Sequence, residues 1–127
     1  MALIQVSRTG RMTRGGFLSA ILNRLPGAWI QPTENDLVSL YRMRYRMAMD
    51  EGKYDAALIF LNKILEVDPS NIEAKLGKGE IFHRHIRDFD RAIEQYNKVI
   101  RLTAGEPAGA IHARARASMT ELLELLS

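Results

Sequence analysis

The sequence of 127 residues contains no cysteine, and its first 31 residues contain no acidic side chain. Without cysteine, the chain has no disulfide framework, no thiolate zinc site and no cysteine nucleophile. It also contains no run of 18 apolar residues, so no segment has the length and apolar character of a transmembrane helix. Hydrophobic residues make up 46% and charged residues 26%, which indicates an ordinary globular chain of one domain's length.

The net charge of +3 is unevenly distributed along the chain. Residues 1–31 carry Arg8, Arg11, Arg14 and Arg24 without an acid, whereas the remaining 14 basic and all 15 acidic residues leave the rest at −1. A nearly neutral body argues against a general nucleic-acid-binding surface. The arginines of the first segment also lack interspersed aromatic residues on which bases could stack. We therefore expect no nucleic-acid partner.

Two segments repeat each other at an offset of 35 residues. The matched pairs are Tyr54 with Phe89, Ala57 with Ala92, Leu58 with Ile93, Leu61 with Tyr96, Asn62-Lys63 with Asn97-Lys98, and Ile64-Leu65 with Val99-Ile100. Apolar residues recur at helical spacing in each copy, and a separate helical stretch precedes each copy. The pattern predicts two consecutive helical hairpins.

Capping and breaking residues predict five helices in all. We expect turns at residues 51–53, 68–71, 87–88 and 103–107, and a first helix that ends near Asp50. Thr33 is the expected N-cap of the first helix, and Ser70 or Asn71 that of the third. Pro107 suits the first position of the fifth helix. No segment shows the sustained alternation of a strand, so the predicted class is all-α.

The paired hairpins resemble the tetratricopeptide repeat, a helix-turn-helix unit of about 34 residues. The residues that carry the resemblance are Gly79, Phe82, Ala92 and Tyr96 in the second unit, and Tyr41, Ala57 and Pro69 in the first. The resemblance implies an α-solenoid of antiparallel helices over residues 32–127. Its units would span residues 38–71 and 72–106, followed by a capping helix at 107–126, with residues 1–31 as an N-terminal extension.

Three features depart from the family pattern. One is Ala104, which stands at the closing position of the second unit where the family has proline. Tyr45 stands in the first unit where the family has a small residue, so we expect that helix pair to pack less closely. The second unit has one extra residue between Phe82 and Phe89, which gives the offset of 35.

The resemblance also implies a protein or peptide partner, held on the concave face formed by the first helices of the units. The residues carried over to that groove are Arg42, Arg46, Met49, Leu76, Glu80 and His83. The family's clamp for a C-terminal carboxylate is not expected, because its asparagines are missing and Glu73 and Glu80 oppose an acidic ligand. The alternative interpretation is an ordinary solvated face.

Two repeat units cannot cover both of their ends. At the N-terminal end, an amphipathic docking segment is formed by Phe17, Leu18, Ile21, Leu22, Leu25 and Trp29. Its apolar edge spans only about two and a half turns, too short for a helix that is stable alone in water. The segment would dock on the chain's own repeats, on another subunit or, through residues 8–29, on an anionic membrane surface.

At the C-terminal end, the fifth helix can cover the second unit. Ala110, Ala113 and Ala117 form a stripe of small residues that we expect to pack against the fourth helix. The leucine-rich tail of residues 121–126 is too apolar for a solvated cap. It packs either on the chain itself or on a partner, which includes a second copy in a homo-oligomer.

The sequence shows no catalytic pattern. His83 and His85 lie two residues apart, so on a helix they point about 200° apart and do not converge on a metal. We interpret them, with His112, as ordinary surface or turn histidines. No phosphate-binding loop and no nucleophile elbow occurs. We expect no catalytic residue, no metal and no cofactor.

These features together predict a non-enzymatic interaction module, a small adaptor or assembly subunit in the cytoplasm. The alternatives are a membrane-associated scaffold anchored by the N-terminal segment and a peptide-binding chaperone. An organellar matrix is the alternative location, because an arginine-rich start without acids resembles a transit peptide.

Overall fold

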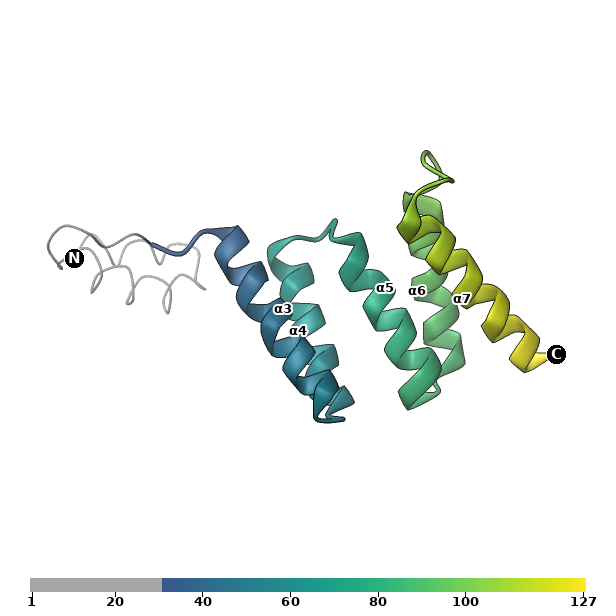
Figure 1. Cartoon of the computed structure of the whole chain (residues 1–127), viewed down its shortest axis with the longest axis horizontal. Coiled ribbons are helices and arrows are strands. Elements are labelled where there is room, and N and C mark those ends of the chain that lie inside the picture. The colour runs from purple at the N-terminus through teal and green to yellow at the C-terminus, as the bar shows by residue number, and fades with distance from the viewer. Residues whose placement is uncertain (1–30) are drawn as a thin grey trace, which may run out of the picture. The chain divides into compact units, whose positions relative to one another are not determined.

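The computed structural model describes residues 31–127, and the predicted docking segment lies outside this range. From Glu34 onward, the described residues form one compact unit, Glu34–Ser127. Within the described range, the structure contains five α-helices and one π-helical segment and no strand (Figure 1). They are α3 (Glu34–Asp50), α4 (Tyr54–Val67), α5 (Ile72–Ile81), η2 (Phe82–Ile86), α6 (Phe89–Leu102) and α7 (Ala110–Leu126). The predicted all-α class is confirmed.

Within Glu34–Ser127, successive helices lie side by side in the order of the sequence (Figure 1). α3 packs on α4, α4 on α5, α5 and η2 on α6, and α6 on α7. α5 also contacts α7, so the first helices of consecutive hairpins approach one another. This is the stacking of helical hairpins in which each unit contacts only its neighbours.

Local side chains set the helix ends. The Oδ1 atom of Asn71 accepts a hydrogen bond from the amide of Ala74 at 2.9 Å, which confirms Asn71 as the N-cap of α5. The Asp88 carboxylate caps α6 in the same way, through the amide of Arg91 at 3.3 Å. Each such cap satisfies an amide that has no partner within the helix and contributes about 0.5–2 kcal/mol.

The core consists of two clusters that meet at α5. The first joins α3, α4 and α5 through Ala57, Leu61, Ile64, Ala74 and Ile81, with Val38 and Ala48. The second joins α5, α6 and α7 through Leu76, Phe82, Ala92, Tyr96 and Val99, with Ala115 and Leu122. A fully buried Leu or Phe contributes about 1.5–3 kcal/mol through removal of its apolar surface from water. The two hairpins therefore stabilise each other, because α5 contributes buried residues to both clusters.

Gly79 allows α5 to approach α6. A Cβ atom placed on Gly79 would lie 2.8 Å from Cε1 of Tyr96, a separation that carbon atoms do not tolerate. The Tyr96 ring is fully buried and occupies the space that any other residue at position 79 would need. The family resemblance at these two positions thus has a direct packing reason.

The extra residue of the second unit is absorbed by the π-helical segment η2. One residue inserted into an α-helix produces this wider turn. The segment closes with Arg87 in the left-handed conformation at φ 64°, and the amide of Asp88 donates to the carbonyl of Phe82 at 2.9 Å. The insertion therefore leaves the packing of α5 and α6 intact.

Two expectations for the fifth helix are corrected. α7 begins at Ala110 with Gly109 as its N-cap, and Pro107 lies in the preceding turn. The stripe Ala110, Ala113 and Ala117 is exposed. The buried face of α7 instead comprises His112, Ala115, Ser118 and Leu122. Ile111 and Met119 pack beside this face, so its burial removes more apolar surface from water than burial of three alanines would.

The leucine-rich tail is split between two environments. Leu122 is fully buried in the second core cluster, whereas Leu123, Leu125 and Leu126 are about half exposed. Self-packing therefore accounts for the first of these leucines and not for the other three.

Candidate functional site

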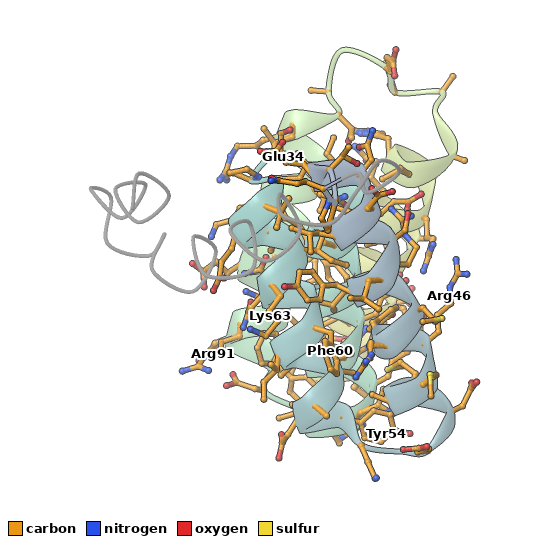
Figure 2. All side chains as sticks on the ribbon, turned by 90° about the vertical axis from the view of Figure 1, so that its left-hand side faces the viewer. Glu34, Arg46, Tyr54, Phe60, Lys63 and Arg91 are labelled. Atoms are coloured by element: carbon orange, nitrogen blue, oxygen red, sulfur yellow. The ribbon has the colours of Figure 1, made fainter. Side chains whose placement is uncertain are left out.

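A cleft of about 270 Å³ opens between α3 and α5, on the side where the first helices of the hairpins approach one another. Its lining residues are Arg42, Tyr45, Arg46, Leu61, Ile64, Asn71, Glu73, Ala74, Gly77 and Arg114. The buried apolar residues of α4 and α5 form its floor, and the polar side chains form its walls. Figure 2 shows Arg46 projecting from α3 on the side opposite Lys63 and Arg91.

Tyr45 reaches across this cleft from α3. Its hydroxyl lies 3.5 Å from the position that a Cβ on Gly77 would occupy. Burial raises the pKa of the Tyr45 hydroxyl, and the nearby Glu80 carboxylate raises it further. The phenol is therefore neutral at physiological pH and available as a hydrogen-bond donor. Because Gly77 has no side chain, the floor of the cleft beneath this hydroxyl stays open.

Arg114 enters the cleft from α7 because Glu80 holds it. The guanidinium forms a bidentate pair with the Glu80 carboxylate, with Nη2 to Oε1 at 2.6 Å and Nε to Oε2 at 2.9 Å. The hydrogen bond that Arg114 donates to Glu80 is the main reason that the pKa of Arg114 is raised. Glu80 is therefore already paired, and it does not oppose an acidic ligand as the sequence suggested.

A second bidentate ion pair, between Arg84 of η2 and Glu121 of α7, also holds α7 in place. Arg84 contacts both carboxylate oxygens of Glu121 at 3.1 Å and donates to the hydroxyl of Ser118 at 3.4 Å. The hydrogen bond from Arg84 lowers the pKa of the Glu121 carboxyl. Exposed ion pairs contribute little stability because water screens the two charges. Their effect here is to orient α7 and so to position Arg114 at the cleft.

The structure brings some of the expected groove residues together and removes others. Arg42 and Arg46 line the cleft, and Glu80 lies beside it through Arg114. Met49 is half-buried against the first core cluster. Three polar contributors were missed from the sequence, Tyr45, Asn71 and Arg114. Arg114 carried no local signal, because it reaches the cleft from a helix 34 residues beyond Glu80.

The groove assignments of Leu76 and His83 are corrected because both side chains are buried. Leu76 belongs to the second core cluster. His83 lies in η2, and its Nδ1 atom is hydrogen-bonded to the Tyr96 hydroxyl at 2.9 Å. Helical spacing placed both residues on the groove side, but the contacts with α6 draw them into the core.

The histidines also differ from the surface interpretation. Burial lowers the pKa of His83, which favours its neutral form. His112 is buried and lies 2.7 Å from the Thr103 hydroxyl, which joins the start of α7 to the end of α6. His85 is exposed but stacks on Tyr54, with ring centroids 3.9 Å apart. Within residues 31–127, no group of three His, Cys, Asp or Glu side chains is placed to hold a metal ion.

Hairpins that stack in sequence order, with a cleft walled by their first helices, define a helical-repeat protein of the kind that presents a concave binding surface. The family model of the tetratricopeptide repeat matches residues 46–71, which include the end of α3, all of α4 and the turn into α5. The match supports the resemblance of the hairpins to the tetratricopeptide repeat. No curated protein and no solved structure matches the chain.

The family match defines the general class of activity. Tetratricopeptide repeats generally mediate protein or peptide binding and are generally non-catalytic, so the match suggests a protein-protein interaction module. Among the helices of residues 31–127, none combines the length and apolar character needed to cross a bilayer.

Proposed function

We propose that the protein is a non-enzymatic adaptor or assembly subunit that holds an extended segment of a partner protein in the cleft between α3 and α5. The observation that supports this most directly is the combination of Arg42, Arg46 and Arg114 around a floor kept open by Gly77. The volume of about 270 Å³ lies at the lower edge of pockets for small molecules, which span about 300–1,000 Å³. It suits the side chains of a peptide that continues along the surface.

The charges of the cleft favour a partner segment that presents oxygen acceptors. Arg42 and Arg46 lie four residues apart on one face of α3, and Glu73 is the acidic residue among the lining side chains. The planar guanidinium offers several N–H donors in a fixed geometry that matches carboxylates and carbonyls. Tyr45 adds a neutral donor at the centre. The partner segment would therefore contribute backbone carbonyls and acidic side chains.

Site-specific photocrosslinking on the full-length chain tests this proposal. A benzophenone amino acid replaces Arg46 at the cleft or Asn97, an exposed residue of α6, as a matched control. We expect a discrete adduct in cell extract from position 46 and none from position 97. Equal adducts from both positions, or none from position 46, would contradict a partner in the cleft.

Charge reversal identifies the contribution of the arginines once the adduct is known. Arg42→Glu should weaken binding of that partner at least tenfold, while Arg101→Glu on α6 should change it less than twofold. Both positions lie on helix surfaces, so circular dichroism should show unchanged helix content. Equal loss in both variants would indicate a general charge effect and not a binding cleft.

The docking segment, Phe17, Leu18, Ile21, Leu22, Leu25 and Trp29, lies outside the described residues and stays a proposal. Its support is the sequence, which concentrates a charge of +4 beside an apolar edge within the first 31 residues. Basic amphipathic segments of this kind bind anionic lipid surfaces, although four charges and so few apolar residues bind weakly. A peripheral membrane association is therefore the second candidate.

A further inference from the structure

The cleft between α3 and α5 continues into a second cavity. This cavity has a volume of about 420 Å³ and is lined by residues from the start of α3 and from the turn between α4 and α5, among them Glu34 and Asp68. Arg42 and Asn71 line both cavities, so the two join into one groove along α3. Figure 2 shows Glu34 at the start of α3 and Arg46 further along the same helix.

The end of the groove at the cleft is basic. Arg42, Arg46 and Arg114 line it, and Glu73 contributes a carboxylate to the same lining. Glu80 lies beside this end but is already bound to Arg114. Within residues 31–127, neither Arg42 nor Arg46 forms an ion pair. Two guanidinium groups at this end are therefore available to bind an anionic side chain.

The end of the groove at the second cavity is acidic. Glu34 and Asp68 line it, and Arg42 is the cation that borders it from the cleft. Glu34 forms no ion pair with any of residues 31–127. Asp68 accepts hydrogen bonds from the hydroxyl of Ser70 at 3.0 Å and from the side-chain amide of Asn71 at 3.3 Å. These donors are neutral and leave the charge of Asp68 uncompensated, so this end favours a cationic side chain.

The distance between the two ends sets the spacing of the side chains that fit them. Along the axis of α3, Arg42 and Arg46 lie about 12 and about 18 Å from Glu34, at a rise of about 1.5 Å per residue. An extended chain advances about 3.3 Å per residue and covers this distance in about four or five residues. Successive side chains of an extended chain point to opposite faces, so two that face the groove are an even number of positions apart. The spacing that fits is therefore four.

We infer that the groove selects an extended partner segment with an acidic residue and a basic residue four positions apart. The acidic side chain meets Arg42 and Arg46, and the basic side chain meets Glu34 and Asp68. This inference rests on the proposed function of the cleft and adds a second determinant of specificity to it. The chain's own N-terminal extension is a poor occupant, because residues 1–31 contain no acid for the basic end.

Chemical-shift titration of the isotope-labelled full-length chain tests the inference with four short model peptides. All have blocked ends and a neutral sequence rich in glycine and proline, which disfavours a helix. The first carries Glu and Lys four positions apart, the second carries the same two residues adjacent, the third carries Glu at both positions and the fourth carries Lys at both. We expect the first peptide to bind at least threefold more tightly than each of the others, with an affinity that falls as salt rises.

The possible outcomes separate this inference from the proposed function. If the first and third peptides bind equally and Arg46→Glu weakens both, the cleft binds an acidic segment without help from the acidic end, which overturns the inference alone. Equal binding of the first and second peptides would also overturn it, because the spacing would then have no effect. Shift changes outside the groove, or no binding of any peptide at millimolar concentration, would contradict the cleft and the inference together.

Charge reversal at the acidic end should change the preference of the groove, which a purely structural role would not do. Glu34→Lys should weaken binding of the first peptide and strengthen binding of the third, so that the third binds at least threefold more tightly. Asp90→Lys is the matched control, because Asp90 is also an exposed acid in the first turn of a helix, α6, and does not line the groove.

The control variant should keep the wild-type order of the four peptides. Circular dichroism should show the same helix content for both variants, because both substitutions are exposed and remove an acid from the first turn of a helix. A Glu34→Lys variant that keeps the wild-type order, or an Asp90→Lys variant that also reverses it, would overturn the inference.

Discussion

Replacement of Gly79 by alanine adds one methyl group at the closest approach of α5 to α6. The added Cβ would lie 2.8 Å from Cε1 and 2.9 Å from Cδ1 of Tyr96, and 3.3 Å from Cβ of Gln95. The Tyr96 ring is fully buried and its hydroxyl is hydrogen-bonded to His83, so it has no free space into which it can rotate. Either the two helices separate or the ring leaves its position.

The magnitude follows from three effects on the free energy of unfolding, of which two destabilise the fold and one stabilises it. Overpacking of a core of this kind costs about 1–3 kcal/mol. A strained His83–Tyr96 hydrogen bond adds about 0.5–1.5 kcal/mol to that cost. Alanine in place of glycine within a helix gains about 1 kcal/mol through its higher helix propensity. We therefore expect a net destabilisation of about 0.5–3.5 kcal/mol.

Thermal unfolding followed by circular dichroism measures this change, with two glycines as a graded control. A domain of 60–100 residues loses roughly 4–8 °C in melting temperature per kcal/mol. Gly77→Ala should be nearly neutral, because its Cβ would meet the movable end of Leu61 at 3.2 Å. Gly105→Ala meets nothing within 4 Å and should not lower the melting temperature. A Gly79→Ala variant as stable as the wild type would refute the packing argument.

Three further predictions concern pH, the C-terminal helix and the N-terminal extension. Burial lowers the pKa of His83, so this imidazole binds a proton more readily in the unfolded chain than in the folded one. The free energy of unfolding should therefore fall as the pH decreases below about 6.5. His83→Gln should flatten that decline, measured by urea titrations at pH 5 and 7. Leu122→Ala should lower the free energy of unfolding by about 2–5 kcal/mol in chemical denaturation, because Leu122 is fully buried. The same change at the half-exposed Leu123 should lower it by less than about 0.5 kcal/mol. Equal losses in the two variants would contradict the position of α7. In liposome flotation, anionic vesicles should retain the full-length chain and release the Leu22→Asp variant, and retention of both would refute the membrane proposal.

Much of the fold could be predicted from local sequence signals. The spacing of apolar residues indicated the helices, and Asn71 and Asp88 stand at turns that do begin α5 and α6. Helix ends depend on side chains within a few residues, which is why the sequence reports them well. The one misplaced start, at Pro107, arose because proline favours the first turn of a helix but also the turn before it.

The candidate cleft was less predictable, because its residues come from three helices. Arg42 and Arg46 were identified from their shared face on α3. Leu76 and His83 were assigned to the same surface, but contacts with α6 bury both. Arg114 was not identified at all, since its position depends on an ion pair with Glu80 that spans 34 residues of sequence.

The sequence by itself determined the all-helical class, the two repeated hairpins and the extra residue that appears as η2. These properties follow from short-range spacing, and each helix carries that information within itself. The tertiary structure decided which face of α7 is buried, which histidines lie in the core and which residues of α3 are exposed. Periodicity shows that a helix has an apolar face, but only the neighbouring helices decide whether that face is covered.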